Sequence, residues 1–237
     1  MILLPEFDPV FLNLGFVSIR WYGLMYVLGF MIARYIGRNV RVKTYDSMQR
    51  TLTNDEWVDL LSSLATGVIF GGRIGYIIFY QLSYFYQNPF RIFAIWEGGM
   101  SFHGAFLGFV LALFVFSRVK KIDIFSLFDL AALSSPPGLA FGRLGNFING
   151  ELWGRVSSVP WAMVFPHSDL LPRHPSQIYE LMGEGFFLYL LIAYHAKKND
   201  RSEGSLGAWF VIHYAWIRFM IEFFREPDYG VGYVIFD

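Results

Sequence analysis

The sequence predicts an all-α fold, a polytopic bundle of helices that spans a membrane. Two features of the chain lead to this class. Of its 237 residues, 55% are hydrophobic and only 16% are charged, which is too apolar a composition for an ordinary soluble domain. The apolar residues also gather in runs that are long enough to cross the hydrocarbon core of a bilayer. We therefore expect a single integral membrane domain over residues 1–237.

Apolar runs mark the candidate spans. Their lengths place six spans at about residues 16–36, 57–80, 101–117, 124–147, 178–195 and 206–224. The third and fifth are short, so their ends are the least sharply defined. Residues 148–177 connect the fourth span to the fifth and form a sizeable loop.

Polar residues interrupt these apolar runs. In chain order they are Arg20, Tyr22 and Tyr26 in the first span, Arg73 in the second, His103 in the third, Arg143 and Asn146 in the fourth, Tyr179, Glu180 and Glu184 in the fifth, and Arg218, Glu222 and Arg225 in and directly after the sixth. Residues of this kind are expensive inside a membrane and are a default sign of a functional site.

The distribution of lysine and arginine predicts the orientation, because cytoplasmic loops are enriched in both. These residues concentrate in the loops after the first, third and fifth spans, whereas the first fifteen residues hold none. We therefore expect an outer N-terminus and place residues 148–177 on the outer side. On this topology the polar residues converge on the outer leaflet.

Two arginines at that depth predict recognition of an anion. Each charge near the bilayer centre costs about 2.5 to 3.5 kcal/mol on insertion scales, so Arg143 and Arg218 need compensation. Their planar forks of donors suit the phosphate of a phospholipid headgroup. The alternative is structural, with both arginines paired to Glu151, Glu180 or Glu222 to hold helices together.

A polar stripe on the last span supports either interpretation. Tyr214, Arg218, Glu222 and Arg225 follow one another at spacings of four, four and three residues, so a helix places them on one face. Tyr214 could bind a headgroup through its hydroxyl, as could Tyr26 on the first span. Both tyrosines are equally typical of the aromatic belt at a membrane interface.

Two further places along the chain, the start of the third span and the segment after the fourth, offer groups suited to chemistry. His103 opens the third span, and an imidazole there could take a proton from a thiol; a lone histidine is otherwise a satisfied interfacial residue. Beyond the fourth span, Asn146 and Glu151 offer polar groups while Gly154 permits irregular backbone over a cavity. Ordinary helix termination would select the same residue types.

Several classes of function find no support in the sequence. The formal net charge is zero, which gives no reason to expect nucleic acid as a partner. Cysteine is absent, so disulfides, thiolate metal sites and an enzyme thiol nucleophile are excluded. Because the chain has no metal-ligand spacing and no phosphate-binding glycine loop after a strand, we expect neither a metal nor an organic cofactor.

Four motifs in order along the chain resemble the prolipoprotein diacylglyceryl transferases. They read SFHG at residues 101–104, GRLGNFINGELWGR at 142–155, RHPSQIYE at 173–180 and RFMIEFFR at 218–225. The resemblance extends from Pro5 to Asp228. It implies an enzyme of the bacterial inner membrane, multi-pass, with its active site toward the outer, periplasmic side.

The reaction implied by this resemblance begins lipoprotein maturation. The diacylglyceryl group of phosphatidylglycerol passes to the lipobox cysteine thiol of a preprolipoprotein, glycerol phosphate leaves, and a thioether forms. The resemblance implies His103 as base or thiol-positioning group and Arg143 and Arg218 as the cations that hold the phosphate. It implies substrate-binding roles for Tyr26, Asn146, Glu151, Gly154, Tyr214, Glu222 and Arg225.

One departure from the family pattern stands at the end of the chain. Family members usually have a seventh span after the Arg225-Glu226-Pro227-Asp228 segment, whereas only residues 229–237 follow here. So few residues cannot cross a bilayer. We therefore expect six spans, with the usual seventh absent.

Two rival functions use the same arginines. An anion transporter or channel would line its path with them, although the inner halves of the third and sixth spans are mostly apolar. A noncatalytic lipid-binding protein would hold an anionic lipid without altering it.

Overall fold

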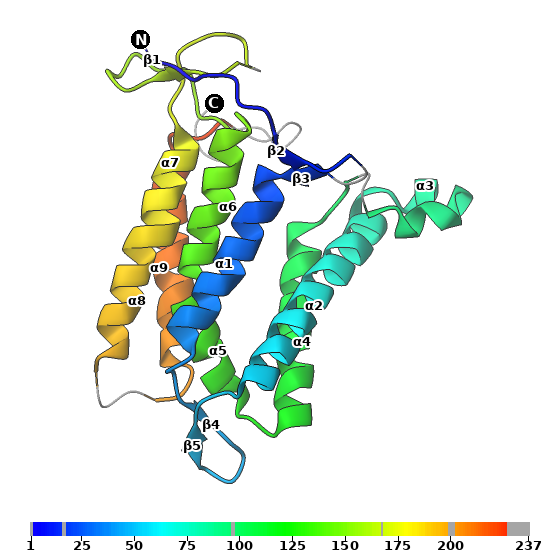
Figure 1. Cartoon of the computed structure of the whole chain (residues 1–237), viewed down its shortest axis with the longest axis vertical. Helices are drawn as coiled ribbons and strands as arrows, with labels where there is room; N and C mark the ends of the chain where they lie inside the picture. The colour runs from blue at the N-terminus through cyan, green and yellow to red at the C-terminus, as the bar shows by residue number, and fades with distance from the viewer. Residues whose placement is uncertain (1, 16–17, 96–97, 167, 199–201, 227–237) are drawn as a thin grey trace. The chain divides into compact units, whose positions relative to one another are not determined.

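A computed structural model describes residues 2–15, 18–95, 98–166, 168–198 and 202–226 (Figure 1). The chain divides into two compact units. Unit 1 comprises Met1–Gly37 with Ala131–Asp237, and unit 2 comprises Arg38–Leu130. The fold is mostly helical and its few strands are very short. This agrees with the predicted helical membrane protein at the level of its class.

Unit 1 is a set of helices packed along one another (Figure 1). Its elements are β1 (Ile2–Leu3), β2 (Val10–Asn13), β3 (Ser18–Arg20), α1 (Trp21–Gly37), α6 (Pro136–Ile148), β6 (Met163–Val164), α7 (Ser176–Glu180), the π-helix η3 (Leu181–Phe187), α8 (Leu188–Ala196) and α9 (Ser205–Glu222). β1 pairs in parallel with β6, and β2 pairs in antiparallel with β3.

The core of unit 1 lies where α8 packs against the start of α9. Leu188, Ile192 and Leu206 are fully buried there with Ala132. On the other side of α6, Gly29 of α1 meets Gly138 so closely that a Cβ at residue 29 would lie 3.1 Å from the Gly138 Cα. Such close approach lets α1 and α6 run side by side.

Unit 2 consists of two long helices with short elements at their ends. These are β4 (Val42–Lys43), β5 (Gln49–Arg50), α2 (Asn54–Tyr80), α3 (Leu82–Gln87), the 3₁₀ helix η1 (Pro89–Phe93) and α4 (Phe102–Lys120). β4 and β5 pair in antiparallel. The helix α5 (Ile124–Ser134) begins in unit 2 and ends in unit 1.

Glycines on both partners allow α2 and α4 to pack backbone against backbone. A Cβ at Gly75 would lie 2.7 Å from the Gly104 Cα, and one at Gly71 would overlap the Gly104 carbonyl oxygen. Toward the other end, Trp57, Leu60 and Leu113 lie in a buried cluster with Val42, Leu52, Phe116, Ile122, Leu127 and Leu130. The small residues and this cluster together fix the pair.

The helix that contains the predicted second span begins with a cap, a few residues before the apolar run. Thr53 accepts a hydrogen bond from the Glu56 amide at 3.2 Å, and Glu56 accepts one from the Thr53 amide at 2.9 Å. Arg50 holds Glu56 through two contacts of 2.7 Å. This capping box begins α2 at Asn54 rather than at residue 57.

Two other predicted spans are not uniform α-helices. Residues 124–147 form α5 and α6, which break at Ser135 before Pro136 and Pro137; proline has no amide donor and clashes with the preceding turn. Residues 178–195 fall within a run in which the π-helix η3 separates α7 from α8. Each of these two predicted spans therefore contains an irregular stretch of helix, and the spans themselves stay predictions.

The number of spans is only partly tested. By length and composition, α2 and α4 are long and apolar enough to cross a membrane, and α5 with α6 would be a third span if taken together. That result concerns the described residues alone. The start of the predicted first span, residues 16–17, and the chain end at 227–237, where the seventh span was expected to be absent, lie outside them.

Candidate functional site

Six charged side chains of unit 1 form one connected group, which we call the arginine–glutamate cluster. It contains Arg143 of α6, Glu180 of α7, Glu184 of η3, Arg218 and Glu222 of α9, and Arg225 just beyond α9. The formal charges of the six sum to zero when all are ionised.

Glu180 is the central carboxylate of the cluster, and its side chain is 0% exposed. Its Oε1 lies 2.7 Å from a terminal nitrogen of Arg218 and 3.2 Å from Nε of Arg225. Its Oε2 lies 3.3 Å from Nε of Arg143. One buried acid thus holds three arginines, which offsets the cost of burying each charge.

Glu184 lies one turn further along the same helical run and makes longer contacts. Its Oε2 is 3.4 Å from a terminal nitrogen of Arg143, and its Oε1 is 3.7 Å from Arg218. The side chain is only 1% exposed. Glu180 and Glu184 both face α6 and α9 because residues four apart lie on one side of a helix.

The predicted stripe on α9 is confirmed as a set of contacts. Arg218 pairs with Glu222 at 2.7 Å, and Arg225 pairs with Glu222 at 3.3 Å. Glu222 is 40% exposed, unlike the two buried glutamates. The spacing of four and three residues along α9 places these three side chains against one another.

Arg143 and Arg218 are bound from one side and open on the other. Their side chains are 22% and 27% exposed, although both contact fully buried carboxylates. The contacts of Arg143 to glutamate use Nε and one terminal nitrogen, which leaves the other terminal nitrogen for a ligand. The geometry supplies fixed cationic donors at a partly open surface.

Two tyrosines from the predicted set border this cluster. Tyr214 lies within electrostatic range of Arg143, Glu184 and Arg218. Tyr26 lies within electrostatic range of Arg143, and its hydroxyl is 3.2 Å from that of Tyr22. Tyr26 is 50% exposed. Both phenols therefore lie within electrostatic range of Arg143.

The end of α6 is fixed by a second polar group. The Asn146 amide donates to Glu151 Oε1 at 2.9 Å, and Asn149 donates to the same oxygen at 3.3 Å. Gln177 donates to the Glu151 carbonyl at 2.7 Å. Glu151 therefore ties the turn after α6 to Asn146 rather than pairing with an arginine of the cluster.

Comparisons with known proteins agree on one family. The family model described as prolipoprotein diacylglyceryl transferase matches residues 9–236. The chain is 49% identical over 228 residues to the phosphatidylglycerol–prolipoprotein diacylglyceryl transferase of Geobacter sulfurreducens, covering 96% of this chain and 86% of that protein.

The chain belongs to the prolipoprotein diacylglyceryl transferase family. Two more proteins of the same name are similar over comparable lengths. The one from Oleidesulfovibrio alaskensis is 48% identical, covering 100% of this chain and 86% of its own length. The one from Pasteurella multocida is 46% identical, covering 96% and 83%. The resemblance predicted from the four motifs is confirmed.

Gly154, from the longest family motif, has a structural explanation within unit 1. Its amide donates to the His174 carbonyl at 2.9 Å, its carbonyl accepts from Arg173 at 3.0 Å, and it bridges to Arg225. A Cβ here would overlap the Phe224 carbonyl and lie 2.8 Å from the His174 Cβ. Only glycine fits where these segments cross.

His103, from another family motif, belongs to unit 2. It is exposed in the first turn of α4, with its ring 5.7 Å from that of Phe102. Ser101 caps this turn by accepting from the Gly104 amide at 3.3 Å. His103 and the arginine–glutamate cluster thus lie in different units.

Arg73, the other charge noted within a predicted span, is occupied by its own unit. Its guanidinium donates to the carbonyls of Arg91 and Gly98, both at 2.6 Å, and to those of Ile92, Ala94 and Gly99. It also lies over the Phe85 ring. These contacts fold the segment before α4, so Arg73 has a structural role.

Glu180 and Glu184 are the residues that we did not select from the sequence as part of the site. Both were noted as polar positions of the fifth span, and Glu180 was named as a partner in the structural alternative for the arginines. Two acids four residues apart in an apolar helix were the available signal. The ion pairs of the structural alternative are therefore present, and Arg143 pairs with both Glu180 and Glu184.

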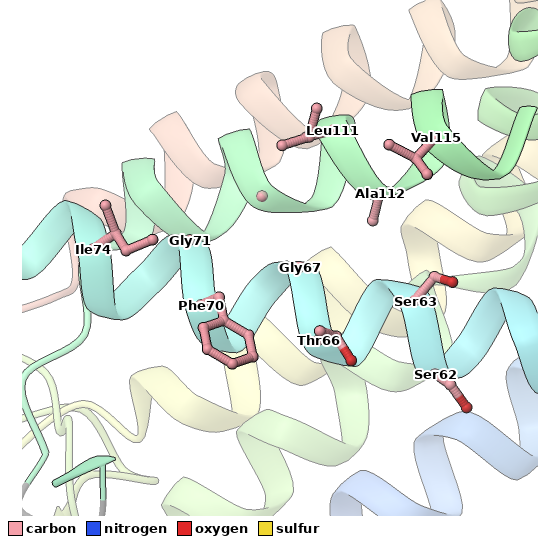
Figure 2. Close-up of a pocket in the computed structure, with 11 residues that line it drawn as sticks. Ser62, Ser63, Thr66, Gly67, Phe70, Gly71, Ile74, Leu111, Ala112 and Val115 are labelled. Atoms are coloured by element: carbon pink, nitrogen blue, oxygen red, sulfur yellow. The ribbon is translucent and has the colours of Figure 1, made fainter. Parts of the chain in front are cut away.

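A groove of about 490 Å³ lies between α2 and α4 (Figure 2). Phe70, Ile74, Leu111 and Val115 line it, with the hydroxyls of Ser62, Ser63 and Thr66 on α2. No charged side chain lines this groove, so it offers no counter-charge for a phosphate. Among the described residues, no group of three or more metal-ligating side chains lies together.

Proposed function

We propose that this chain is a transferase that moves the diacylglyceryl group of phosphatidylglycerol to a prolipoprotein. The observation that carries the proposal is membership of the family across residues 9–236, together with relatives named for this activity at 46–49% identity. We further propose that the acceptor is the lipobox cysteine thiol of a preprolipoprotein. This transfer is the first step of bacterial lipoprotein maturation.

The reaction is a displacement at the glyceryl carbon that carries the phosphate. The cysteine sulfur forms a bond to this carbon, the carbon–oxygen bond to phosphate breaks, and glycerol phosphate leaves with the electron pair. The thiol proton must be removed, and the negative charge on the leaving phosphate must be stabilised. A thioether and glycerol phosphate are the products.

Arg143 and Arg218 are proposed to hold the phosphate before and during the displacement. Both are held at fixed positions by buried glutamates, and both keep an exposed portion. Donors that are already oriented stabilise developing charge without reorganising during the reaction. Tyr26, Tyr214, Glu222 and Arg225 are proposed to support headgroup binding around them.

The remaining family positions receive roles by the same proposal. His103 is the proposed base or thiol-positioning group. Asn146 and Glu151 fix the turn after α6, and Gly154 holds the end of α9 against the loop; both would shape the substrate-binding surface.

The proposed setting is a bacterial inner membrane. The protein would form a multi-pass membrane domain, with the N-terminus and residues 148–177 on the outer side, where the bilayer supplies the lipid. The lysine and arginine distribution supports this orientation. No nucleic acid and no metal or organic cofactor takes part in the proposed reaction.

The proposal is tested with headgroup-labelled phosphatidylglycerol and a lipobox-cysteine peptide, both added to the purified full-length protein. We expect release of labelled glycerol phosphate in step with addition of one diacylglyceryl group to the peptide, seen by mass. A serine-for-cysteine peptide is the control and should give neither product, because the hydroxyl is a poorer nucleophile than a thiolate.

The rival functions give different results in the same preparation. Lipid that binds but remains intact, with no modified peptide, would indicate a noncatalytic lipid-binding protein. Anion flux across sealed vesicles without peptide modification would indicate a transporter. Either result overturns the transferase proposal.

A further inference from the structure

The carboxylates of the arginine–glutamate cluster are not equally well compensated. The Glu180 contacts to arginine are 2.7, 3.2 and 3.3 Å long. Glu184 has only contacts of 3.4 and 3.7 Å. Each acid has one buried oxygen without a hydrogen bond, Oε1 of Glu184 and Oε2 of Glu180, so the two differ in the lengths of their ion pairs. Glu184 is therefore the buried acid whose negative charge is held most weakly.

Titratable and charged groups face Glu184 from α6, from α9 and from its own helical run. Arg143 approaches from α6, and Arg218 approaches from α9. Tyr214 of α9 lies within electrostatic range, and Glu180 is its acidic neighbour on the same helical run. The two arginines that hold Glu184 are the same two that we propose bind the substrate phosphate.

Charge balance changes when a phosphate enters this group. The empty cluster holds three arginines and three glutamates. A phosphodiester brings one more negative charge and competes with Glu184 for Arg143 and Arg218. An extra buried charge of this kind is costly, and a weakly held acid neutralises instead of bearing it.

We propose that Glu184 takes up one proton when an anionic phosphodiester occupies Arg143 and Arg218. The proton comes from the surrounding water, and it converts the Glu184 carboxylate to the neutral acid as its arginine contacts are given to the phosphate. Glu184 is thus a positioning residue, which acts through the two arginines. The inference rests on the proposed function in its choice of phosphatidylglycerol as the ligand.

The other glutamates are poorer acceptors for this proton. Glu180 keeps a contact to Arg225 in addition to those shared with the phosphate. Glu222 is 40% exposed, so water already stabilises its charge. Burial and weak pairing coincide only at Glu184.

The experiment counts protons during binding. Phosphatidylglycerol in a neutral detergent is titrated calorimetrically into the full-length protein at one pH, in two buffers of different ionisation enthalpy. The difference in observed heat gives the number of protons exchanged. We expect uptake of about one proton, with an affinity that falls about tenfold for each unit of increasing pH through the range of uptake.

The decisive variant is Glu184→Gln, which mimics the protonated acid. It should bind the lipid with no proton uptake and with little dependence on pH. Asp59→Asn is the matched control, because Asp59 is an ion-paired but exposed carboxylate of unit 2, and it should keep the uptake of one proton. The wild-type count needs no variant, so a count of zero overturns the inference even if Glu184→Gln does not fold.

A second arm uses glycerophosphoglycerol, the same phosphodiester without acyl chains. If both ligands bind, the site recognises the phosphodiester itself; if only the lipid binds, it recognises the headgroup of a membrane lipid. In either case, binding of the ligand should be accompanied by the uptake of one proton. Binding of wild-type protein without proton uptake, or equal uptake by Glu184→Gln, would overturn the inference.

The transferase assay separates this inference from the proposed function. An active enzyme that binds lipid without proton uptake refutes the role of Glu184 and leaves the transferase proposal in place. Lipid binding with uptake of one proton but without peptide modification refutes the transferase proposal and leaves the role of Glu184 in place. Failure to bind either phosphodiester would overturn the inference along with the headgroup role of the arginines.

Discussion

Glu180 is the residue on which the arrangement of the three arginines depends. Its two oxygens contact Arg143, Arg218 and Arg225, which come from α6, from α9 and from the segment after α9. Arginine cannot lose its charge in a protein. Removal of the central acid would therefore leave buried cations without their main counter-charge.

We accordingly predict that Glu180→Gln destabilises unit 1 strongly. Loss of one partner of a buried ion pair costs about 3 to 5 kcal/mol, and this change weakens three pairs at once. The free energy of unfolding in mixed micelles is the measurement. The half-exposed Glu222 provides the comparison, since Glu222→Gln should cost at most about 1 kcal/mol; equal losses would contradict the central role of Glu180.

The planar fork of Arg143 leads to a second prediction. A lysine at this position keeps the charge but cannot contact Glu180, Glu184 and a phosphate together. We expect Arg143→Lys to lower kcat/KM for diacylglyceryl transfer by about 100-fold or more. Arg118→Lys is the control, which tests whether replacing any arginine by lysine would lower kcat/KM in the same way. Arg118 lies over the Phe114 ring in unit 2, and its replacement should leave kcat/KM within about twofold of wild type.

At this scale the sequence predicted the arginines well and their partners less well. Arg143 and Arg218 stand out because charge in an apolar run is rare. Glu184 did not enter the predicted site because its relation to Arg143 depends on how α6 packs against η3. That packing is a tertiary feature that one sequence does not express.

The pairing of α2 with α4 depends on glycines rather than on large apolar side chains. We predict that Gly75→Ala costs about 1 to 3 kcal/mol in unfolding free energy, because its Cβ would press on the Gly104 backbone. Gly23→Ala is the matched helical control. A Cβ at Gly23 meets nothing within 4 Å, so alanine should stabilise α1 by up to about 1 kcal/mol. Equal effects at both sites would refute the close contact.

The segment between α6 and α7 is held by an ionic clamp centred on Arg173. Arg173 contacts Asp169 at 2.7 Å and Glu226 at 3.1 Å. Its amide and carbonyl also exchange hydrogen bonds with Met163. The hydrogen bonds from Arg173 hold the pKa of the Asp169 carboxyl below its ordinary value.

This clamp should loosen only in acid. Because the folded pKa of Asp169 is depressed, its contribution is present above the unfolded value of about 3.9 and is lost as the pH falls through the folded value. We expect pepsin to cleave residues 156–173 faster below about pH 4. The variant Asp169→Asn should already be cleaved faster than wild type at pH 4. The ratio of its cleavage rate to that of wild type should shrink as the pH falls.

Helix positions were predictable from apolar length, but helix details were not. The predicted and observed ends of the third and sixth spans differ by only a few residues. The Pro136-Pro137 pair is the sequence signal for the break at Ser135. The predicted span rests on the length of the apolar run and does not use this signal. The π-helix at Leu181–Phe187 leaves no comparable signal, because it changes hydrogen bonding without changing hydrophobicity.

The orientation of the whole chain can be tested directly because the sequence contains no cysteine. A single cysteine at exposed Ser158 should react with a membrane-impermeant maleimide in intact spheroplasts. A cysteine at Met48, which is 62% exposed, should react only after permeabilisation. This follows from the excess of lysine and arginine in the loops predicted to be cytoplasmic. The opposite labelling pattern would refute the proposed topology.

For the whole molecule, a single membrane domain stays a prediction, and the structure divides the chain into two compact units. Composition and span length carry no information on such a division, because both units are built from apolar helices. The family, by contrast, was recognisable from short motifs that lie in both units.

The neutrality of the arginine–glutamate cluster has a consequence for its response to voltage. A membrane potential acts on net charge, with about 2.3 kcal/mol for each elementary charge moved through 100 mV. Three arginines and three glutamates fixed to one another experience opposing forces that cancel. The empty site should therefore keep its shape whether the cell is energised or depolarised. A bound phosphodiester accompanied by the uptake of one proton adds no net charge, so the occupied site should respond to voltage as little as the empty one.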